Sequence, residues 1–216
     1  MNKRLIVALD FNNAKEALLF LENLDPSKCL VKVGLELFIS EGWRILELIS
    51  EKGFEIFLDL KLHDIPNTVA NSVKKISNFN VAMTTIHLSG GKDMIEAAAS
   101  ERGNIKILGV SILTSLSKND IFEITDSNFG IYFNNLISIA SNTNVNGIVC
   151  SPNELDKLKN FNKLKVVPGI RNDISDDDQK RVMSPMEAYK KGADFIVVGR
   201  PITKSEDPRK ALELFL

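Results

Sequence analysis

Short apolar runs rich in valine, isoleucine and leucine recur along the chain, and a longer segment of mixed polarity follows each of them. The runs are continuous rather than alternating, which is typical of strands covered on both faces in a parallel sheet. Their starts lie 18 to 41 residues apart, which leaves room for the crossover that a parallel pair requires. The eight predicted strands are Leu5–Asp10, Cys29–Gly34, Glu55–Leu62, Val81–Leu88, Lys106–Leu113, Gly147–Cys150, Lys165–Ile170 and Phe195–Arg200.

The segments between these runs have the pattern of amphipathic helices. One helix is predicted over Ala14–Leu24, before Asp25-Pro26, and one continuous helix over Leu35–Lys52, before Gly53. Proline is favoured in the first turn of a helix, where its missing N–H costs nothing. Three helix starts are predicted in this way, at Pro66, Pro185 and Pro208.

Eight strands that alternate with helices predict an α/β fold, a closed (β/α)8 TIM barrel formed by residues 1–216 as a single domain. An open, doubly wound sheet is the alternative, because one miscounted strand would mimic it. The sixth unit is the least certain, since only 18 residues separate the starts of its strand and the next.

Composition and charge narrow the function. The 27 basic and 28 acidic side chains leave a net charge of -1, too small to attract a nucleic acid or an anionic membrane by bulk electrostatics. The two cysteines, Cys29 and Cys150, lie in apolar runs and form no CxxC pair, which favours a reducing compartment and no structural zinc. The apolar run at the N-terminus is shorter than a signal-peptide core. A cytoplasmic protein is therefore expected, with neither nucleic acid nor membrane as a partner.

Charged residues interrupt the predicted strands near their C-terminal ends. Asp59 and Lys61 share one face of the third strand, Asp10 ends the first, Lys32 lies within the second, and Asp64 follows the third. Opposite charges 4 Å apart attract by about 4 kcal/mol at an effective dielectric constant near 20, although desolvation offsets much of this. A structural ion-pair network is the alternative interpretation. We favour an array that places a lysine for proton transfer, because barrel enzymes carry their chemistry at this end.

A second cluster follows the last two strands, where barrel enzymes frequently bind phosphate. Gly169 and Arg171 end the seventh strand, and Gly199 and Arg200 end the eighth. Glycine lets backbone N–H groups approach an anion, and arginine offers a bidentate fork. The alternative is that the glycines only form tight turns and the arginines are solvated. The polar residues 172–181 between these strands are interpreted as a solvated loop, with a lid as the functional alternative.

Two further residues are weaker candidates. His87 is expected to be a packed, hydrogen-bonded residue rather than a metal ligand or a base, because the chain has only two histidines and no carboxylate at metal spacing. Thr114, after the fifth strand, either presents its hydroxyl to a ligand or caps the next segment.

The segment Asp59-x-Lys61-x-x-Asp64-Ile65-Pro66-Asn67-Thr68 resembles the signature of the orotidine 5'-phosphate decarboxylases, the enzymes that make UMP. The DxKxxD core alone is shared by a wider superfamily of phosphate-binding barrels, and the extension through His63 and Ile65–Thr68 makes the resemblance specific. It continues over nearly the whole chain, through Val7–Asp10, Val31–Gly34, Leu113–Ser115, Pro168–Arg171, Gln179 and Val198–Ile202.

The resemblance implies a role for each catalytic residue. Lys61 donates a proton to C6 of the pyrimidine once carbon dioxide leaves, and Asp59 faces the substrate carboxylate. Lys32 links the two aspartates and hydrogen-bonds the ribose. Asp64 reaches into the site of a partner subunit. The implied substrate-binding residues are Asp10, Ile65, Thr68, Thr114, Arg171, Gln179, Gly199 and Arg200.

The resemblance also implies orotidine 5'-monophosphate as the small-molecule substrate, a homodimer with two shared sites, and no metal ion or organic cofactor. The nearest rival is a sugar-phosphate enzyme of the same superfamily, of the 3-keto-L-gulonate 6-phosphate decarboxylase or hexulose phosphate synthase type. Those enzymes use Mg²⁺ and carry glutamate where Lys32 stands, so Lys32 argues against them. A catalytically silent nucleotide-binding barrel and a Schiff-base aldolase using Lys61 are the remaining alternatives.

Overall fold

The computed structural model describes residues 3–171 and 183–216. Its eight strands form a closed barrel in which neighbours in sequence are neighbours in the sheet and all pairs are parallel. Strand β1 pairs with β8, Leu5 opposite Ile196, so the predicted closed barrel is confirmed and the open sheet is excluded. The strands are β1 (Leu5–Ala8), β2 (Cys29–Gly34), β3 (Ile56–Leu62), β4 (Val81–His87), β5 (Lys106–Val110), β6 (Gly147–Val149), β7 (Leu164–Pro168) and β8 (Phe195–Val198).

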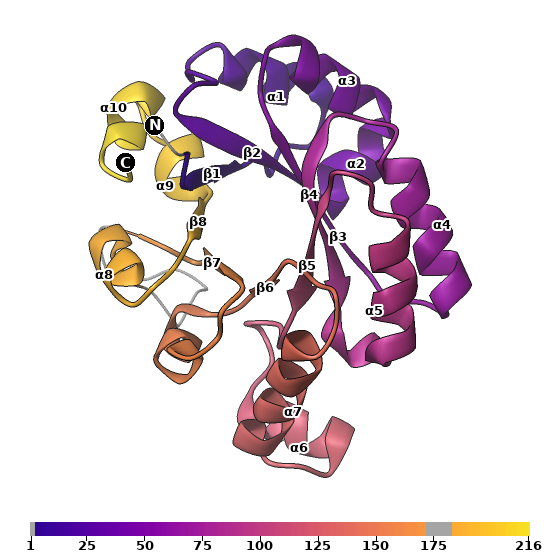
Figure 1. The fold of residues 1–216 in the computed structure, drawn as a ribbon. Helices are drawn as coiled ribbons and strands as arrows, with labels where there is room; N and C mark the ends of the chain where they lie inside the picture. Colours follow the sequence, from indigo (N-terminus) through magenta and orange to yellow (C-terminus); the bar gives the residue numbers. More distant parts are fainter. Residues whose placement is uncertain (1–2, 172–182) are drawn as a thin grey trace.

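Helices surround the ring of strands (Figure 1). Over the described ranges, none of them is long and apolar enough to cross a lipid bilayer. They are α1 (Ala14–Leu21), α2 (Leu35–Glu41), α3 (Arg44–Glu51), α4 (Pro66–Ile76), α5 (Gly91–Ser100), α6 (Lys118–Thr125), α7 (Phe129–Ser141), α8 (Pro185–Lys190), α9 (Arg200–Thr203) and α10 (Pro208–Glu213), with 3-10 turns η1 (Leu88–Gly90) and η2 (Pro152–Leu158). The helix starts predicted at Pro66, Pro185 and Pro208 are confirmed.

The alternation of side chains along the strands divides the core in two. One set of positions packs against the helices and forms the larger cluster. The other set points into the barrel and forms a smaller cluster of Ile6, Ala8, Leu30, Phe57, Met83, Leu108, Val166 and Val197. This inner cluster fills the barrel, as it does in this fold generally. The residues that follow it toward the C-terminal ends of the strands therefore line the mouth.

The single helix predicted over Leu35–Lys52 is wrong, because two helices, α2 and α3, occupy this segment. Gly42 has a φ of 63°, in the region that favours glycine, and ends α2. The next residue, Trp43, stacks on Phe79 with ring centroids 4.7 Å apart and meets Phe38 edge-on. These aromatic contacts turn the chain before α3 begins.

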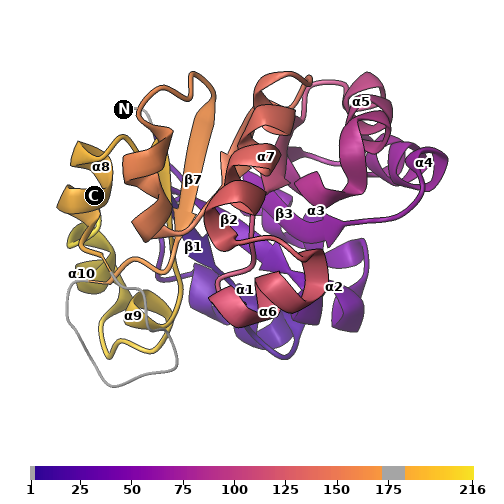
Figure 2. The same cartoon turned by 90° about the horizontal axis from the view of Figure 1, so that it is seen from below.

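The fifth and sixth units differ most from the regular repeat. After β5 the chain forms two helices, α6 and α7, which lie side by side on one flank of the barrel (Figures 1 and 2). After β6 it forms only the 3-10 turn η2. The two helices after β5 explain the long sequence distance between the starts of the fifth and sixth strands, and the single turn after β6 explains the short distance between the sixth and seventh.

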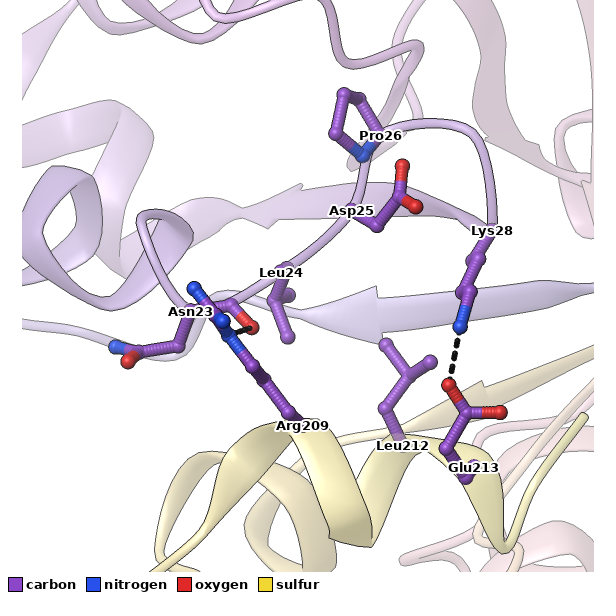
Figure 3. Close-up of a pocket in the computed structure, with 8 residues that line it drawn as sticks. All are labelled: Asn23, Leu24, Asp25, Pro26, Lys28, Arg209, Leu212 and Glu213. Atoms are coloured by element: carbon purple, nitrogen blue, oxygen red, sulfur yellow. Dashed lines mark hydrogen bonds and ion pairs between the residues drawn. The ribbon is translucent and has the colours of Figure 1, made fainter.

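The C-terminal helix, α10, bonds to the chain at the N-terminal end of the barrel. Arg209 on α10 donates to the main-chain oxygens of Glu22 and Asn23, 3.2 Å from each, at the C-terminal end of α1. Lys28, just before β2, forms an ion pair with Glu213 (Figure 3). The hollow between α10 and this loop lies at the N-terminal end of the barrel, opposite the end where barrel enzymes carry their chemistry.

Candidate active site

The inward-facing positions change from apolar to charged toward the C-terminal ends of β1, β2 and β3. Asp10 lies two residues beyond Ala8, Lys32 two beyond Leu30, and Asp59 two beyond Phe57. Because alternate residues of a strand share a face, these charged side chains follow the inner cluster toward the mouth. Phe57, two residues before Asp59, lies in the inner cluster, so Asp59 is on the inward-facing side of β3.

Four charged side chains form one chain of alternating sign. Asp59 Oδ2 lies 2.8 Å from Lys61 Nζ and 3.9 Å from Lys32 Nζ, and Lys32 Nζ lies 3.2 Å from Asp10 Oδ1. The side chains of Asp59 and Lys32 are 12% and 13% exposed, whereas that of Asp10 is 59% exposed. The two central charges are thus shielded from water, and the ends of the chain face the mouth. In such a setting ion pairs are stronger than at a free surface.

Lys61 occupies an unusual backbone position. Its φ is 50°, in the left-handed region, which costs a residue other than glycine about 1–3 kcal/mol. The pairing of β3 with β4 shifts register between Leu58 and Leu62, so Lys61 lies in a β-bulge. The Lys61 N–H donates to the hydroxyl of Thr85 on β4, 2.8 Å away. The bulge turns the Lys61 ammonium toward Asp59.

Asp64, Ile65 and Thr68 lie outside this charged chain. Asp64 is exposed, and its Oδ1 accepts the N–H of Ile65 at 2.7 Å. Ile65 is 66% exposed, and Thr68 is exposed in the first turn of α4. Within a single chain the ammonium of Lys61 is therefore paired with Asp59 alone among the described carboxylates. The position of Asp64 in the partner subunit's site, which the resemblance implies, stays a prediction.

The two predicted phosphate-binding segments begin at neighbouring strand ends. Gly199 precedes α9, and Arg200 is the first residue of that helix. A Cβ at Gly199 would lie 3.5 Å from Asp10 Oδ2, so the end of β8 adjoins the charged chain. Arg171, just after β7, is 9% exposed, and its N–H donates to the carbonyl of Met183. Gln179 and the predicted loop or lid lie outside the described residues.

Thr114 lies in an exposed turn between β5 and α6. The serine that caps α6 is Ser117, whose hydroxyl accepts the N–H of Asp120. Of the two roles left open for Thr114, the cap therefore belongs to another residue. The hydroxyl of Thr114 remains a candidate for contact with a ligand.

His87 packs against His63, with ring centroids 5.3 Å apart. Burial, the neighbouring His63 and the Lys61 ammonium lower the pKa of His87 from its ordinary value. The expected packing is confirmed, but no hydrogen bond of its side chain is formed within residues 3–171 and 183–216. Across the same residues, no group of three His, Cys, Asp or Glu side chains is placed to hold a metal ion.

Two buried polar groups beside the mouth, Thr85 and Glu154, were not predicted from the sequence. Thr85 is fully buried and donates to Asp59 Oδ1 at 2.9 Å. Glu154, 3% exposed, accepts the Ser151 N–H at 2.8 Å and the Ser111 hydroxyl at 3.3 Å, which joins the ends of β5 and β6. The S-x-x-E spacing of Ser151 and Glu154 was a readable signal of a helix start. Thr85, in an apolar strand, carried no such signal.

Comparison with known proteins places these features in a family. Residues 3–215 match the sequence model of the Orotidine 5'-phosphate decarboxylase / HUMPS family. An orotidine 5'-phosphate decarboxylase of Wigglesworthia glossinidia brevipalpis is 41% identical, over 98% of this chain and 95% of its own. One of Chromohalobacter salexigens is 42% identical, over 96% and 92%. The crystal structure of orotidine 5'-phosphate decarboxylase from Lactobacillus acidophilus superposes with a TM-score of 0.87 at 34% identity, covering 99% of this chain and 97% of that one.

Proposed function

Because the chain belongs to the orotidine 5'-phosphate decarboxylase / HUMPS family and is an orotidine 5'-phosphate decarboxylase of pyrimidine biosynthesis, we propose the following reaction for it. The enzyme converts orotidine 5'-monophosphate to UMP and carbon dioxide without a metal ion, and Lys61 is the proton donor. The observation that carries this proposal is the alternating chain of Asp10, Lys32, Asp59 and Lys61 at the barrel mouth. It supplies a fixed ammonium in a shielded site, which the chemistry requires.

In the proposed reaction the bond between C6 and the carboxylate breaks, and its electron pair stays on C6. No neighbouring carbonyl can accept these electrons, so the site must stabilise the negative charge electrostatically. A preorganised ammonium does this without reorganising solvent. Lys61 then transfers a proton from Nζ to C6, which gives UMP, and the neutral amine regains a proton from water. Asp59, which faces the departing carboxylate in this scheme, adds a repulsion that ends when carbon dioxide leaves.

The other predicted site residues bind the ribose, the phosphate and the base of the nucleotide. Asp10, at the exposed end of the charged chain, and the adjacent Lys32 hydrogen-bond the ribose. Gly199, Arg200 and Gln179 hold the phosphate, with Arg171 nearby. Thr114 contacts the base. Binding energy from the remote phosphate orients the ring against Lys61, which is how non-reacting groups contribute to a chemical step.

Lys32 separates this proposal from the Mg²⁺-dependent sugar-phosphate enzymes. Its ammonium lies 3.2 Å from Asp10 and 3.9 Å from Asp59, between the two carboxylates that a divalent cation would use. A cation there would meet the repulsion of a fixed positive charge. The donor set therefore fits an ammonium-based mechanism better than a metal-based one.

We further propose that two chains form a homodimer with shared sites. Asp64, Ile65 and Thr68 are exposed, and within residues 3–171 and 183–216 none of their side chains pairs with Asp10, Lys32, Asp59 or Lys61. Apolar side chains accompany them: Leu35 and Ile39 on α2 are 51% and 77% exposed, and Ile65 is 66% exposed. Exposed apolar groups at one end of a barrel favour an interface there. In that dimer Asp64 approaches the Lys61 of the partner chain.

We infer that residues 1–216 act as one domain, because the barrel closes between its first and last strands. We also infer a cytoplasmic location. Both cysteines, Cys29 and Cys150, are unpaired and buried, as is common where thiols stay reduced.

The decisive experiment mixes the purified chain with orotidine 5'-monophosphate in EDTA and follows the loss of orotate-ring absorbance. Fast conversion to UMP is expected, and its loss in Lys61→Ala with UMP binding retained would identify the proton donor. Activity that needs added Mg²⁺ would favour the sugar-phosphate reaction. UMP binding without turnover would favour a silent nucleotide-binding barrel. Trapping of Lys61 by borohydride with a carbonyl substrate would favour an aldolase.

A further inference from the structure

Thr85 connects the two residues on which the proposed chemistry depends. It lies on β4, is 0% exposed, and follows Met83 on the inward-facing side of the strand. Its hydroxyl donates to Asp59 Oδ1 at 2.9 Å and accepts the Lys61 N–H at 2.8 Å. One buried hydroxyl therefore holds both a side-chain oxygen of Asp59 and the main chain of Lys61.

The two hydrogen bonds use the hydroxyl in complementary ways. A threonine hydroxyl has one proton to donate and lone pairs to accept with, and here the proton goes to the carboxylate while a lone pair receives the amide. Because Oδ1 of Asp59 is occupied by Thr85, Oδ2 is the oxygen left for the ammonium groups of Lys61 and Lys32. The accepted N–H also satisfies the amide that the bulge would otherwise leave without a strand partner.

We propose that Thr85 is a positioning residue for decarboxylation: its hydroxyl fixes the Asp59 carboxylate and the left-handed Lys61 backbone in the one arrangement that aims the Lys61 ammonium at C6. This inference rests on the proposed function. Without the hydroxyl, the Asp59 carboxylate is free to rotate and the bulge loses its anchor. The ammonium then samples directions that do not lead to C6. Small misplacements of a reacting group are enough to cost a large factor in rate.

The neighbouring threonine provides a matched control. Thr84 is also 0% exposed, and its hydroxyl donates to the carbonyl oxygen of Leu58 on β3 at 2.8 Å. Thr84 alternates with Thr85 along β4 and so points away from the barrel interior. Replacement of either threonine by valine removes a buried hydroxyl that bonds to β3. Only the replacement at Thr85 removes one that bonds to Asp59 and Lys61.

The test compares kcat and KM for orotidine 5'-monophosphate in four full-length variants, Thr85→Val, Thr85→Ala, Thr85→Ser and Thr84→Val, with urea unfolding of each. We expect kcat to fall roughly 10- to 100-fold in Thr85→Val and Thr85→Ala, with little change in KM. Thr85→Ser, which keeps the hydroxyl, restores most of kcat. Thr84→Val keeps kcat near that of the wild type even where it loses as much stability as Thr85→Val.

Three results in kcat, and one in KM, would overturn the inference while leaving the proposed function intact. The results in kcat are a wild-type kcat in a folded Thr85→Val or Thr85→Ala variant, an equal loss of kcat in Thr84→Val, and a failure of Thr85→Ser to recover activity. A loss confined to KM would assign Thr85 to substrate binding and would also contradict it. If the wild-type chain itself does not convert orotidine 5'-monophosphate, the proposed function fails, and this inference fails with it.

Discussion

Asp59 and Lys61 are only two residues apart on β3, yet their side chains meet, with Lys61 Nζ 2.8 Å from Asp59 Oδ2. A regular strand places such residues about 7 Å apart along its length. The left-handed conformation of Lys61 shortens this path and brings its ammonium back over Asp59. The local backbone, rather than a distant part of the fold, therefore sets the geometry of the proposed proton donor.

Replacing Asp59 by asparagine should lower kcat by roughly 100-fold or more, the scale seen when a preorganised electrostatic group is removed. The two ammonium groups of Lys32 and Lys61 would then face a neutral amide, and Lys61 would lose the charge that directs it. Steady-state kinetics with orotidine 5'-monophosphate measures the effect. The control is Glu55→Gln at the N-terminal side of the same strand, which removes a surface ion pair with Lys3. A wild-type kcat in Asp59→Asn would contradict the proposed array.

Replacing Arg200 by alanine should raise KM for orotidine 5'-monophosphate but leave the slow turnover of orotidine, which lacks the phosphate, unchanged. Hydrogen bonds to charged groups contribute about 1.5–3 kcal/mol, so kcat/KM for the nucleotide should fall roughly 10- to 100-fold. The comparison of the two substrates is the measurement. Arg209→Ala, at the opposite end of the barrel, is the control. Equal losses on both substrates would place Arg200 outside the phosphate site.

Mixing two inactive variants should restore activity if the sites are shared. Lys61→Ala and Asp64→Ala each abolish turnover alone in this scheme. After unfolding and refolding together, a hybrid dimer has one site with both residues intact, so random pairing gives roughly a quarter of wild-type activity. Gel filtration establishes the dimer independently. A dimer that regains no activity on mixing would show that Asp64 acts within its own chain.

The strands were predictable because burial on both faces of a strand requires a continuous apolar run, which is visible in the order of residues. The break between α2 and α3 was not, since Gly42 fits an amphipathic pattern and the turn depends on the stacking of Trp43 on Phe79. That contact joins segments distant in sequence. The 3-10 turn η2 was missed for a related reason, as the space available after β6 is set by its neighbours.

The residues of the site also differ in whether the sequence could predict them. Charges in an apolar strand are conspicuous, so Lys32, Asp59 and Lys61 could be found from alternation and strand polarity. The bulge at Lys61 could not, because it arises from the register between β3 and β4. Thr85 was hidden for a different reason: a threonine is a common strand residue, and only its partners show what its hydroxyl does.

The lowered pKa of His87 should make the folded chain less stable on the acid side of 6.5, its ordinary value. In that range the unfolded chain binds a proton that folded His87 does not, so stability falls as the pH decreases from 6.5 toward the folded pKa. His87→Gln should therefore show a shallower acid-side slope in urea unfolding. The chain has two histidines, so an NMR titration can follow His87 directly. A midpoint at or above 6.5 would contradict this prediction.

A side chain at Gly147, at the start of β6, should destabilise the fold, because Leu164 on β7 occupies the place of a Cβ. A Cβ there would be 2.4 Å from the carbonyl oxygen of Leu164 and 2.6 Å from its Cβ, and the Leu164 backbone is fixed by strand pairing. Gly147→Ala should therefore lower the free energy of unfolding by about 1–3 kcal/mol. Gly130→Ala on α7, whose Cβ would meet its nearest neighbour at 3.4 Å, should instead raise it by about 0.4–1 kcal/mol. Urea unfolding separates the two, and equal effects would show that the close approach of β6 and β7 is not what requires glycine.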